Sequence, residues 1–245
     1  LVDIFGGMDD LKAGIIRCVG NAQARFSEDA LRILRGIRFA AQLGFELEDE
    51  TREGMRLLAP TLRKISAERI QVELVKTLTS SRPDLLREAW KLGITKEFLP
   101  EFDLAMETTQ ETVHHMYTVG EHILHTLLEV RPDRILRLTM LLHDIGKPYM
   151  KTKDADGVAH FKGHPEKSSE LANEILHRLK FDNDTIRKVT KLVRYHDHRM
   201  PVTPAHVRRA VHEIGEDLFP LYLEVRRADV AAQSMYQHKE KVADI

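Results

Sequence analysis

The sequence of 245 residues lacks the features that mark several specialised classes of protein. Cys18 is the only cysteine, which excludes a disulfide framework and is typical of a reducing compartment. No apolar run approaches the roughly 20 residues of a membrane-spanning helix, and no signal peptide is visible. We therefore expect a cytoplasmic protein without a membrane partner.

Glycine and proline are also scarce, at 13 and 9 residues, and long stretches repeat at the helical period. Apolar residues make up 42% of the chain and charged residues 31%, which is typical of a globular protein. These features predict an all-α fold. The formal net charge of −1 gives no general argument for nucleic-acid binding, so any RNA contact must come from local groups.

Histidine is absent from residues 1–113, whereas all 13 histidines lie between His114 and His238. The stretch from Glu97 to Gln110 contains Pro100 and has weak periodicity, so we interpret it as a linker. We therefore place a domain boundary near residue 108. It separates a helical domain at residues 1–108 from a histidine-containing helical domain at residues 109–245.

Capping residues and apolar periodicity locate the expected helices. The first strong one begins with Ser27 as its N-cap and stops at Gly44. A hairpin is expected at Asp156-Gly157. Further helices are predicted at 49–58, 66–78, 83–92, 115–130, 134–144, from His164, at 184–196, from Thr203-Pro204, and at 217–233.

An adjacent His143-Asp144 pair ends an apolar helical run. Histidine is the commonest neutral metal ligand and aspartate is an anionic one, so the pair is a candidate metal site. The alternative is an ordinary helix end with a solvated aspartate. His122, beside an apolar stripe, and Asp229, on an otherwise apolar helix, complete the expected ligand set. For Asp229, a plain pair with Arg226 remains the alternative.

Two more candidates lie at helix ends. His164 begins a helix, where backbone N–H groups attract anions, and His196-Asp197 repeats the adjacent pair. They are candidates for a second metal or for a substrate phosphate, or they are ordinary residues of helix ends.

Together these blocks resemble the HD phosphohydrolase superfamily over roughly residues 110–232. The resemblance implies a helical domain that uses a divalent metal to hydrolyse phosphate esters, with Lys147 and His164 adding positive charge beside the substrate. Nitrogen and oxygen ligands without cysteine leave Mg, Mn, Ni, Co, Fe and Zn open. The matching residues are His122, His143, Asp144, His164, His196, Asp197 and Asp229.

Charged residues line one side of the predicted helix in the first half. Glu28, Arg32, Arg35 and Arg38 follow one another at spacings of four, three and three. One interpretation is a solvated face with a Glu28–Arg32 pair, and the other is a phosphate-binding strip.

The first half resembles the class II tRNA nucleotidyltransferases, which are the CCA-adding enzymes, and the related poly(A) polymerases. Residues 3–17 resemble the flexible-loop motif, 25–35 the nucleotide-templating motif and 66–74 the motif that supports the neck. The catalytic head should precede Leu1 and is absent from the sequence, so we expect a neck and HD fragment of a larger enzyme. The resemblance implies nucleotide binding by Arg17, Glu28, Asp29, Arg32 and Arg35.

Asp29 and Arg32 have a chemistry that suits base reading. Cytosine and adenine present an amino donor beside a ring-nitrogen acceptor, whereas uracil and guanine present a carbonyl beside an N–H. The Asp29 side chain offers acceptors and the Arg32 side chain offers donors, so together they match the first pattern. The alternative is a salt bridge between the two residues.

The leading hypothesis is therefore a fragment of an enzyme that adds CCA to tRNA 3′ ends. Its partners would be tRNA, CTP and ATP in the full-length enzyme, and a phosphate ester such as a 2′,3′-cyclic phosphate at the HD site. Nucleotide addition is expected only with the head restored. Two alternatives stay open: a catalytically silent HD half in a tRNA-binding module, and a free-standing nucleotide phosphohydrolase.

Overall fold

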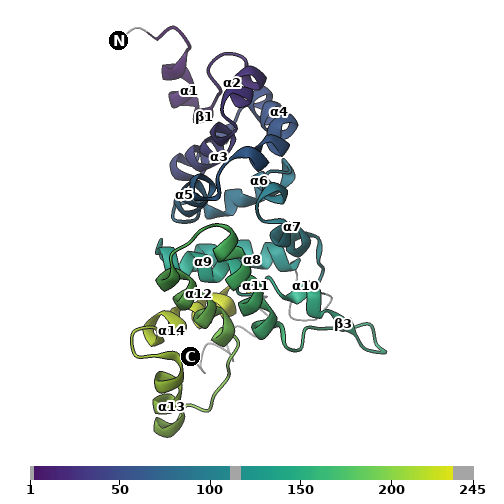
Figure 1. Cartoon of the computed structure of the whole chain (residues 1–245), viewed down its shortest axis with the longest axis vertical. Coiled ribbons are helices and arrows are strands. Elements are labelled where there is room, and N and C mark those ends of the chain that lie inside the picture. Colours follow the sequence, from purple (N-terminus) through teal and green to yellow (C-terminus); the bar gives the residue numbers. More distant parts are fainter. Residues whose placement is uncertain (1–2, 111–116, 234–245) are drawn as a thin grey trace. The chain divides into compact units, whose positions relative to one another are not determined.

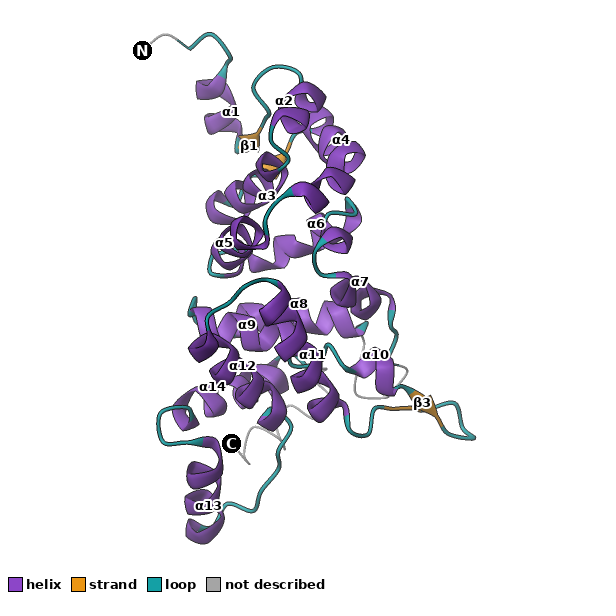
Figure 2. Ribbon diagram, viewed as in Figure 1, coloured by secondary structure: helices purple, strands orange, loops and turns teal. Residues whose placement is uncertain are grey.

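A computed structural model describes residues 3–110 and 117–233, and the described chain is built mostly of helices (Figures 1 and 2). The predicted helical fold class is confirmed. The chain divides into two compact units, Leu1–Pro100 and Glu101–Ile245. The predicted functional boundary near residue 108 stays a prediction. Among the described residues, no helix combines the length and the apolar character needed to cross a membrane.

The first unit consists of short helices with one small parallel sheet. In the sheet, Ile15 pairs with Glu46 and Ile16 with Leu47. The elements are α1 Gly7–Ala13, β1 Ile15–Ile16, α2 Ala22–Glu28, α3 Leu31–Leu43, β2 Glu46–Leu47, α4 Asp49–Leu58, η1 Ala59–Lys64, α5 Ala67–Leu78, η2 Pro83–Leu85, α6 Leu86–Lys91 and η3 Thr95–Glu97.

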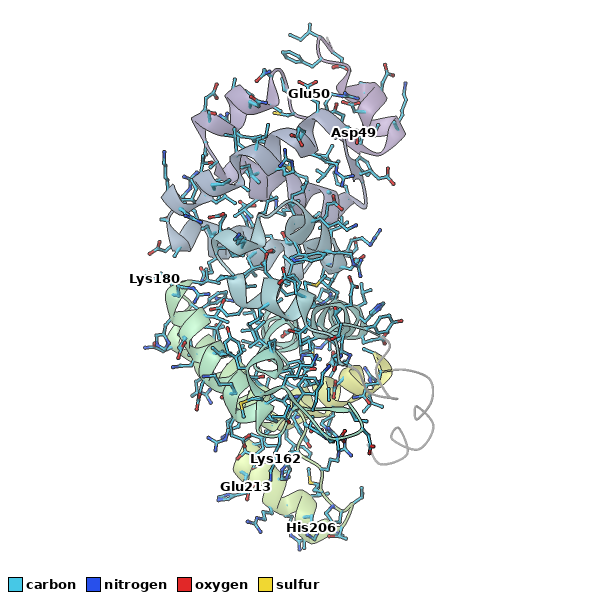
Figure 3. The ribbon with its side chains drawn as sticks, turned by 90° about the vertical axis from the view of Figure 1, so that its right-hand side faces the viewer. Asp49, Glu50, Lys162, Lys180, His206 and Glu213 are labelled. Atoms are coloured by element: carbon cyan, nitrogen blue, oxygen red, sulfur yellow. The ribbon has the colours of Figure 1, made fainter. Side chains whose placement is uncertain are left out.

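The core of this unit lies where α3 packs against α5 and where α2 packs against α4. Ile33 and Ile37, one turn apart on α3, are buried, and so is Leu74 of α5. Helix α4 begins at Asp49 and carries Asp49 and Glu50 in its first turn (Figure 3), where acidic side chains favour the helix dipole.

The expectation that Ser27 caps a single long helix is wrong. Ser27 lies inside α2, which Asn21 caps by accepting a hydrogen bond from the Ala24 N–H at 2.9 Å. The chain leaves the helix at Asp29, whose φ and ψ are −149° and 103°. Asp29 Oδ1 then accepts the N–H of Leu31 at 3.1 Å, where α3 begins. The start of α3 is therefore three residues later than predicted, because the aspartate rather than the serine bonds the free N–H group.

The second unit holds the longer helices and a small hairpin. Strand β3 pairs antiparallel with β4, Thr152 opposite His160, so the predicted hairpin at Asp156-Gly157 is confirmed. The elements of the second unit are α7 Pro100–Glu107, α8 Val119–Glu129, α9 Arg134–Leu142, α10 Lys147–Met150, β3 Thr152–Lys153, β4 Ala159–His160, α11 His164–Arg178, α12 Asn183–Tyr195, α13 Pro204–Ile214 and α14 Phe219–Ala231.

The predicted linker from Glu97 to Gln110 is instead largely helix α7. Pro100 begins it, where a missing N–H costs nothing, and Phe102, Ala105 and Met106 are buried at helical spacing. The predicted start of the next helix at His115 lies outside the described residues.

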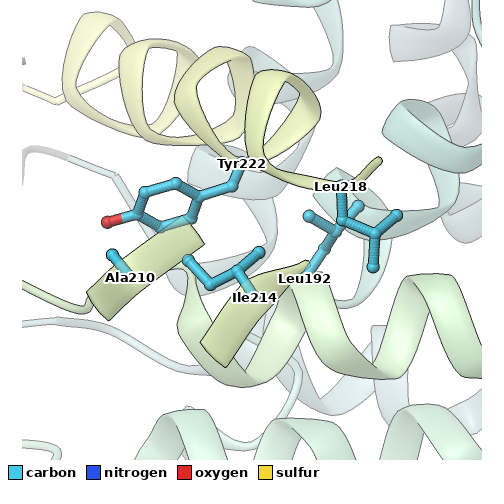
Figure 4. Close-up of a cluster of buried hydrophobic side chains, with 5 residues drawn as sticks. All are labelled: Leu192, Ala210, Ile214, Leu218 and Tyr222. Atoms are coloured by element: carbon cyan, nitrogen blue, oxygen red, sulfur yellow. The ribbon is translucent and has the colours of Figure 1, made fainter. Parts of the chain in front are cut away.

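Within the second unit, α9 packs against α8 and α12, and α11 packs against α12. Figure 1 shows α13 extending away from the other helices of this unit. A cluster of buried side chains attaches it to α12 and α14 (Figure 4), while His206 on the same helix is exposed (Figure 3). Members of the cluster are Leu192, Ala210, Ile214, Leu218 and Tyr222.

Candidate functional site

Helix α8 carries the first candidate ligand. Thr118 caps it by accepting the Glu121 N–H at 3.1 Å. At Gly120, a Cβ atom would lie 2.6 Å from the Met106 backbone, so only glycine allows α7 to approach this closely. His122 is buried one turn into the helix. Its Nε2 lies 2.9 Å from Oδ1 of Asp229 on α14, although the two residues are 107 positions apart.

Helix α9 delivers the adjacent His143-Asp144 pair. Asp133 caps the helix by accepting the N–H groups of the next turn at 2.9 and 3.0 Å. The residues before His143 are buried almost continuously, so the chain enters the core before the pair is reached. At Gly146 a Cβ atom would lie 2.5 Å from the Ser168 backbone nitrogen, so this glycine permits α11 to lie against the turn.

Asp144 lies at the centre of two histidine groups. Its Oδ2 is 3.4 Å from His143 Nε2 and 3.6 Å from His122 Nε2. Its Oδ1 is 3.3 Å from His164 Nε2 and 3.4 Å from His196 Nε2. Each group has the spacing needed to hold one metal ion, and the carboxylate is common to both.

Backbone carbonyls fix the histidine tautomers. Nδ1 of His143 donates to Met140 O at 2.8 Å, and His164 and His196 make equivalent bonds to carbonyls three residues earlier, at 2.9 and 2.6 Å. In the neutral ring, each Nε2 then directs a lone pair towards the centre of the site. A nitrogen lone pair and a carboxylate oxygen repel each other at this distance. The arrangement is stable only when a cation lies between the two groups or when the ring carries a second proton. The donor set therefore fits a divalent metal ion.

Burial and charge shift the pKa values of these groups in opposite directions. Burial lowers the pKa of His143, but the carboxylates of Asp144 and Asp229 outweigh it and raise the value to about 10. Burial raises the pKa of Asp144, yet Lys147 and His143 hold it well below its usual range. For His196, burial lowers the pKa and Asp144 offsets it only in part. The centre thus keeps its carboxylates ionised, as metal ligation requires.

Lys147 supplies a cation at the edge of the cluster. Its Nζ lies 2.6 Å from Asp144 Oδ2 and donates to Gln110 Oε1 at 3.1 Å. Gln110 is also buried and donates to the carbonyl of Tyr117 at 3.3 Å. Sequence reasoning did not identify Gln110, because nothing in the pattern connects it with a lysine 37 positions later.

The structure separates Asp197 from the other predicted ligands. Within the described chain, Asp197 belongs to neither of the two groups of residues that could hold a metal ion. Its Oδ1 lies 3.6 Å from both Arg199 Nε and Arg226 Nη1. Arg226, which the sequence offered only as a partner for Asp229, donates instead to the carbonyl of His196 at 3.0 Å.

The predicted nucleotide-binding residues lie in the first unit, around the start of α3. Arg32 Nη1 donates to Glu28 at 2.5 Å and to the carbonyl of Arg25 at 2.8 Å. Asp29 accepts a hydrogen bond from Arg69 at 2.9 Å, a partner that sequence reasoning missed because it is 40 residues away. Burial raises the pKa of Asp29, but the Leu31 N–H and Arg69 outweigh it and lower the value.

Two of the predicted residues have other partners. Arg17 donates to Asp10 at 2.9 Å and lies 3.4 Å from Glu48. Arg35 is half-exposed and lies 3.7 Å from the buried carboxylate of Glu73. Arg38, the next arginine on the face, is partly buried and pairs with the same carboxylate at 3.1 Å, so it is not a free phosphate-binding group.

In the second unit, five separate blocks of the sequence that carry histidine or aspartate meet in one cluster. This arrangement on helices defines an HD domain. The first unit, also helical, precedes it in the sequence. Two family models agree with this description. The model described as "Probable RNA and SrmB- binding site of polymerase A" matches residues 44–106, and the HD domain model matches residues 112–231.

Curated relatives identify the family. An A-adding tRNA nucleotidyltransferase of Deinococcus radiodurans is 37% identical over 244 residues, which cover 93% of this chain and 55% of that protein. A CC-adding tRNA nucleotidyltransferase of Thermus thermophilus is 36% identical over 214 residues, or 82% of this chain and 49% of that protein. The chain belongs to the class II tRNA nucleotidyltransferase family, and it spans about half the length of these relatives.

Solved structures share the fold. The CCA-adding enzyme of Bacillus stearothermophilus in complex with CTP has a TM-score of 0.67 at 23% identity, over 99% of this chain and 53% of that one. The Thermotoga maritima CCA-adding enzyme complexed with tRNA has a TM-score of 0.53 at 19% identity, over 99% of this chain and 54% of that one. The likeness supports the arrangement of helices described above.

Proposed function

We propose that the second unit is a metal-dependent phosphohydrolase within a tRNA nucleotidyltransferase that maintains tRNA 3′ ends. Its substrates would be phosphate esters, with 2′,3′-cyclic and 2′-phosphates as the expected class. The observation that carries the proposal is the position of Asp144, which lies between two histidine groups with one carboxylate oxygen directed to each.

The ligand roles follow from the distances. His122, His143, Asp144 and Asp229 would hold one ion, and Asp144 with His164 and His196 a second. When bound, such ions lower the pKa of water and neutralise phosphoryl oxygens.

The remaining catalytic parts belong to the chain itself. His164 stands in the first turn of α11, whose free N–H groups attract an anion. Lys147 adds an ammonium group, which Gln110 holds in place at 3.1 Å. The buried ring hydrogen bonds keep the histidine nitrogens oriented without further rearrangement.

Metal content and hydrolysis test the proposal together. Asp144→Ala should lose most bound divalent metal and most hydrolysis of bis(p-nitrophenyl) phosphate across a panel of Mg, Mn, Ni, Co, Fe and Zn. Asp156→Ala is the matched control, because Asp156 is an exposed carboxylate of the hairpin outside both groups. Wild-type protein that binds metal but hydrolyses nothing would instead favour the silent HD domain of a tRNA-binding module.

We also propose that Asp29 and Arg32 read the incoming base in the full-length enzyme, with CTP and ATP as nucleotides and tRNA as acceptor. Two observations support this function over a simple salt bridge. Asp29 pairs with Arg69 rather than with Arg32. Within the described chain Arg32 donates its two hydrogen bonds through Nη1, which leaves its Nε and Nη2 hydrogens for a base edge.

A further inference from the structure

Positive charge is concentrated in one segment of the second unit. From Lys191 to His212 the sequence holds five Lys/Arg residues and one acidic residue, a net charge of +4. The remaining 32 Lys/Arg and 37 Asp/Glu residues give the rest of the chain a net charge of −5. This basic segment runs from the end of α12 through the loop of residues 197–203 into α13. The five basic residues are Lys191, Arg194, Arg199, Arg208 and Arg209.

The basic side chains of α13 lie on the side of the helix that faces away from its packing partners. Ala210 holds the helix to the buried cluster, whereas Arg208, Arg209 and His212 are exposed. Arg208 and His212 are four residues apart and Ala210 lies midway between them, so they occupy opposite sides of the helix. Because α13 extends away from the other helices of this unit (Figure 1), its outer face is accessible to a large partner.

The loop of residues 197–203 and α13 contribute to the same surface. Glu213, labelled in Figure 3, pairs with Arg209 at 2.8 Å. Arg209 above all, with His198 of the loop and His212 of the helix, lowers the pKa of this carboxyl. Cationic groups from the loop and from the helix therefore surround one exposed carboxylate.

An aromatic pair stands where the loop begins. The rings of Tyr195 and His198 lie 5.9 Å apart and are nearly perpendicular, at 78°. Tyr195 packs partly against the buried cluster, and the Tyr222 hydroxyl donates to the carbonyl of His198 at 2.9 Å. The His198 side chain is exposed. An exposed ring on a backbone that is held in place offers a stacking surface for an unpaired base.

The arginines of this surface are available to an anionic partner. Among the described residues, no acidic side chain forms an ion pair with Arg208. Arg209 pairs with Glu213, but these side chains are 78% and 33% exposed. An exposed ion pair contributes little to stability, so a phosphate group can replace the carboxylate at small cost.

We propose that the loop of residues 197–203 and the outer face of α13 bind single-stranded RNA. The arginines would contact phosphate groups, and a base would stack on His198. The inference goes beyond the functions proposed above, because it requires neither hydrolysis nor base reading. The surface also lies outside residues 44–106, which match the RNA-binding family model.

A membrane surface fits these observations less well than RNA does. A helix that lies in a bilayer needs an exposed apolar side. Helix α13 instead uses Ala210 and Ile214 to pack on α12 and α14. On the described loop and helix, Val202 is the one large apolar side chain that is mainly exposed, at 72%.

Arg208→Gln/Arg209→Gln tests the phosphate contacts. Fluorescence anisotropy of labelled oligouridylate measures the dissociation constant of the 245-residue chain over a series of KCl concentrations. At about 0.1 M KCl we expect the constant to rise about tenfold. The slope of log K against log salt should fall by about 1.4, or about 0.7 for each phosphate contact with a single strand.

Arg134→Gln/Lys180→Gln is the matched control. It also removes two exposed positive charges from the second unit, but at the start of α9 and at the turn between α11 and α12. Its dissociation constant should stay within about twofold of wild type, because neither residue belongs to the proposed surface. The thermal unfolding of both double variants should match wild type, since all four side chains are exposed.

His198→Ala tests the stacking contact. It should weaken oligouridylate binding about fivefold and leave binding of an RNA duplex unchanged, because paired bases cannot stack on the ring. His177→Ala, at an exposed histidine of α11, is the control. Unchanged oligouridylate binding in either the arginine variant or His198→Ala would overturn the proposal, and so would equal weakening by the two double variants. Loss of binding to phosphatidylserine vesicles in the arginine variant, with RNA binding intact, would identify a membrane surface instead.

Discussion

Asp144→Asn should strongly destabilise the metal-free protein. Asp144 and Lys147 have side chains only 1% and 9% exposed, and Nζ lies 2.6 Å from Oδ2. Removing one partner of such a buried pair leaves an uncompensated charge and costs about 3–5 kcal/mol. For a protein of this size the melting temperature should fall by about 10 °C. Urea unfolding in EDTA, followed by circular dichroism, measures the free energy directly.

A second substitution shows whether the stranded ammonium group causes the loss. Asp144→Asn/Lys147→Met removes the charge as well, and should recover about half or more of the lost free energy. Asp156→Asn, at an exposed position, should stay within about 0.5 kcal/mol of wild type. Adding Mn²⁺ at 100 times its dissociation constant should stabilise wild type by about 2.7 kcal/mol and leave Asp144→Asn unchanged. A loss below about 1 kcal/mol in Asp144→Asn would refute the reasoning.

Three further predictions follow from the geometry. The folded-state pKa of His143 is raised to about 10, so its stabilising contribution in metal-free protein should be fully present below about pH 6.5 and lost as the pH rises through about 10. Urea unfolding measures this. Over the same pH range, the free energy of unfolding should change less with pH in His143→Gln than in wild type. Gly146→Ala should destabilise by about 1–3 kcal/mol, since the new Cβ would collide with the Ser168 backbone; wild-type stability in the same denaturation assay would contradict this. In the full-length enzyme, Arg32→Ala should lower the preference for C and A over U and G by about ten- to a hundredfold, whereas Arg35→Ala should weaken binding without changing preference. The test is to measure kcat/KM for all four nucleotides with both variants. Equal slowing of all four by Arg32→Ala would favour a structural role for this arginine.

Local signals in the sequence were sufficient for much of the fold. Thr203-Pro204 and His164-Pro165 predict helix starts that the structure confirms, because a cap or a first-turn proline depends on neighbouring residues alone. The apolar run that carries His143 inward likewise predicts its burial. Such features need no knowledge of the partner elements.

Other features depend on residues far away in the sequence. The pairing of Asp29 with Arg69 and the support of Lys147 by Gln110 join positions that no periodicity relates. The break between α2 and α3 was missed because Asp29 resembles an ordinary acidic first-turn residue unless its own side-chain bond is known. The sequence order indicated the cluster around Asp144, but only the fold shows how the carboxylate is shared.

The position of Asp29 has a consequence for how base preference can change during evolution or design. The side chain proposed to read the base also begins α3, through Leu31, and joins it to α5 through Arg69. Replacing the carboxylate to favour another nucleotide would therefore also disturb a helix start and an interhelical link. A lineage could shift its nucleotide preference here only together with compensating changes elsewhere in the helices, so selectivity and folding would have to evolve as one trait.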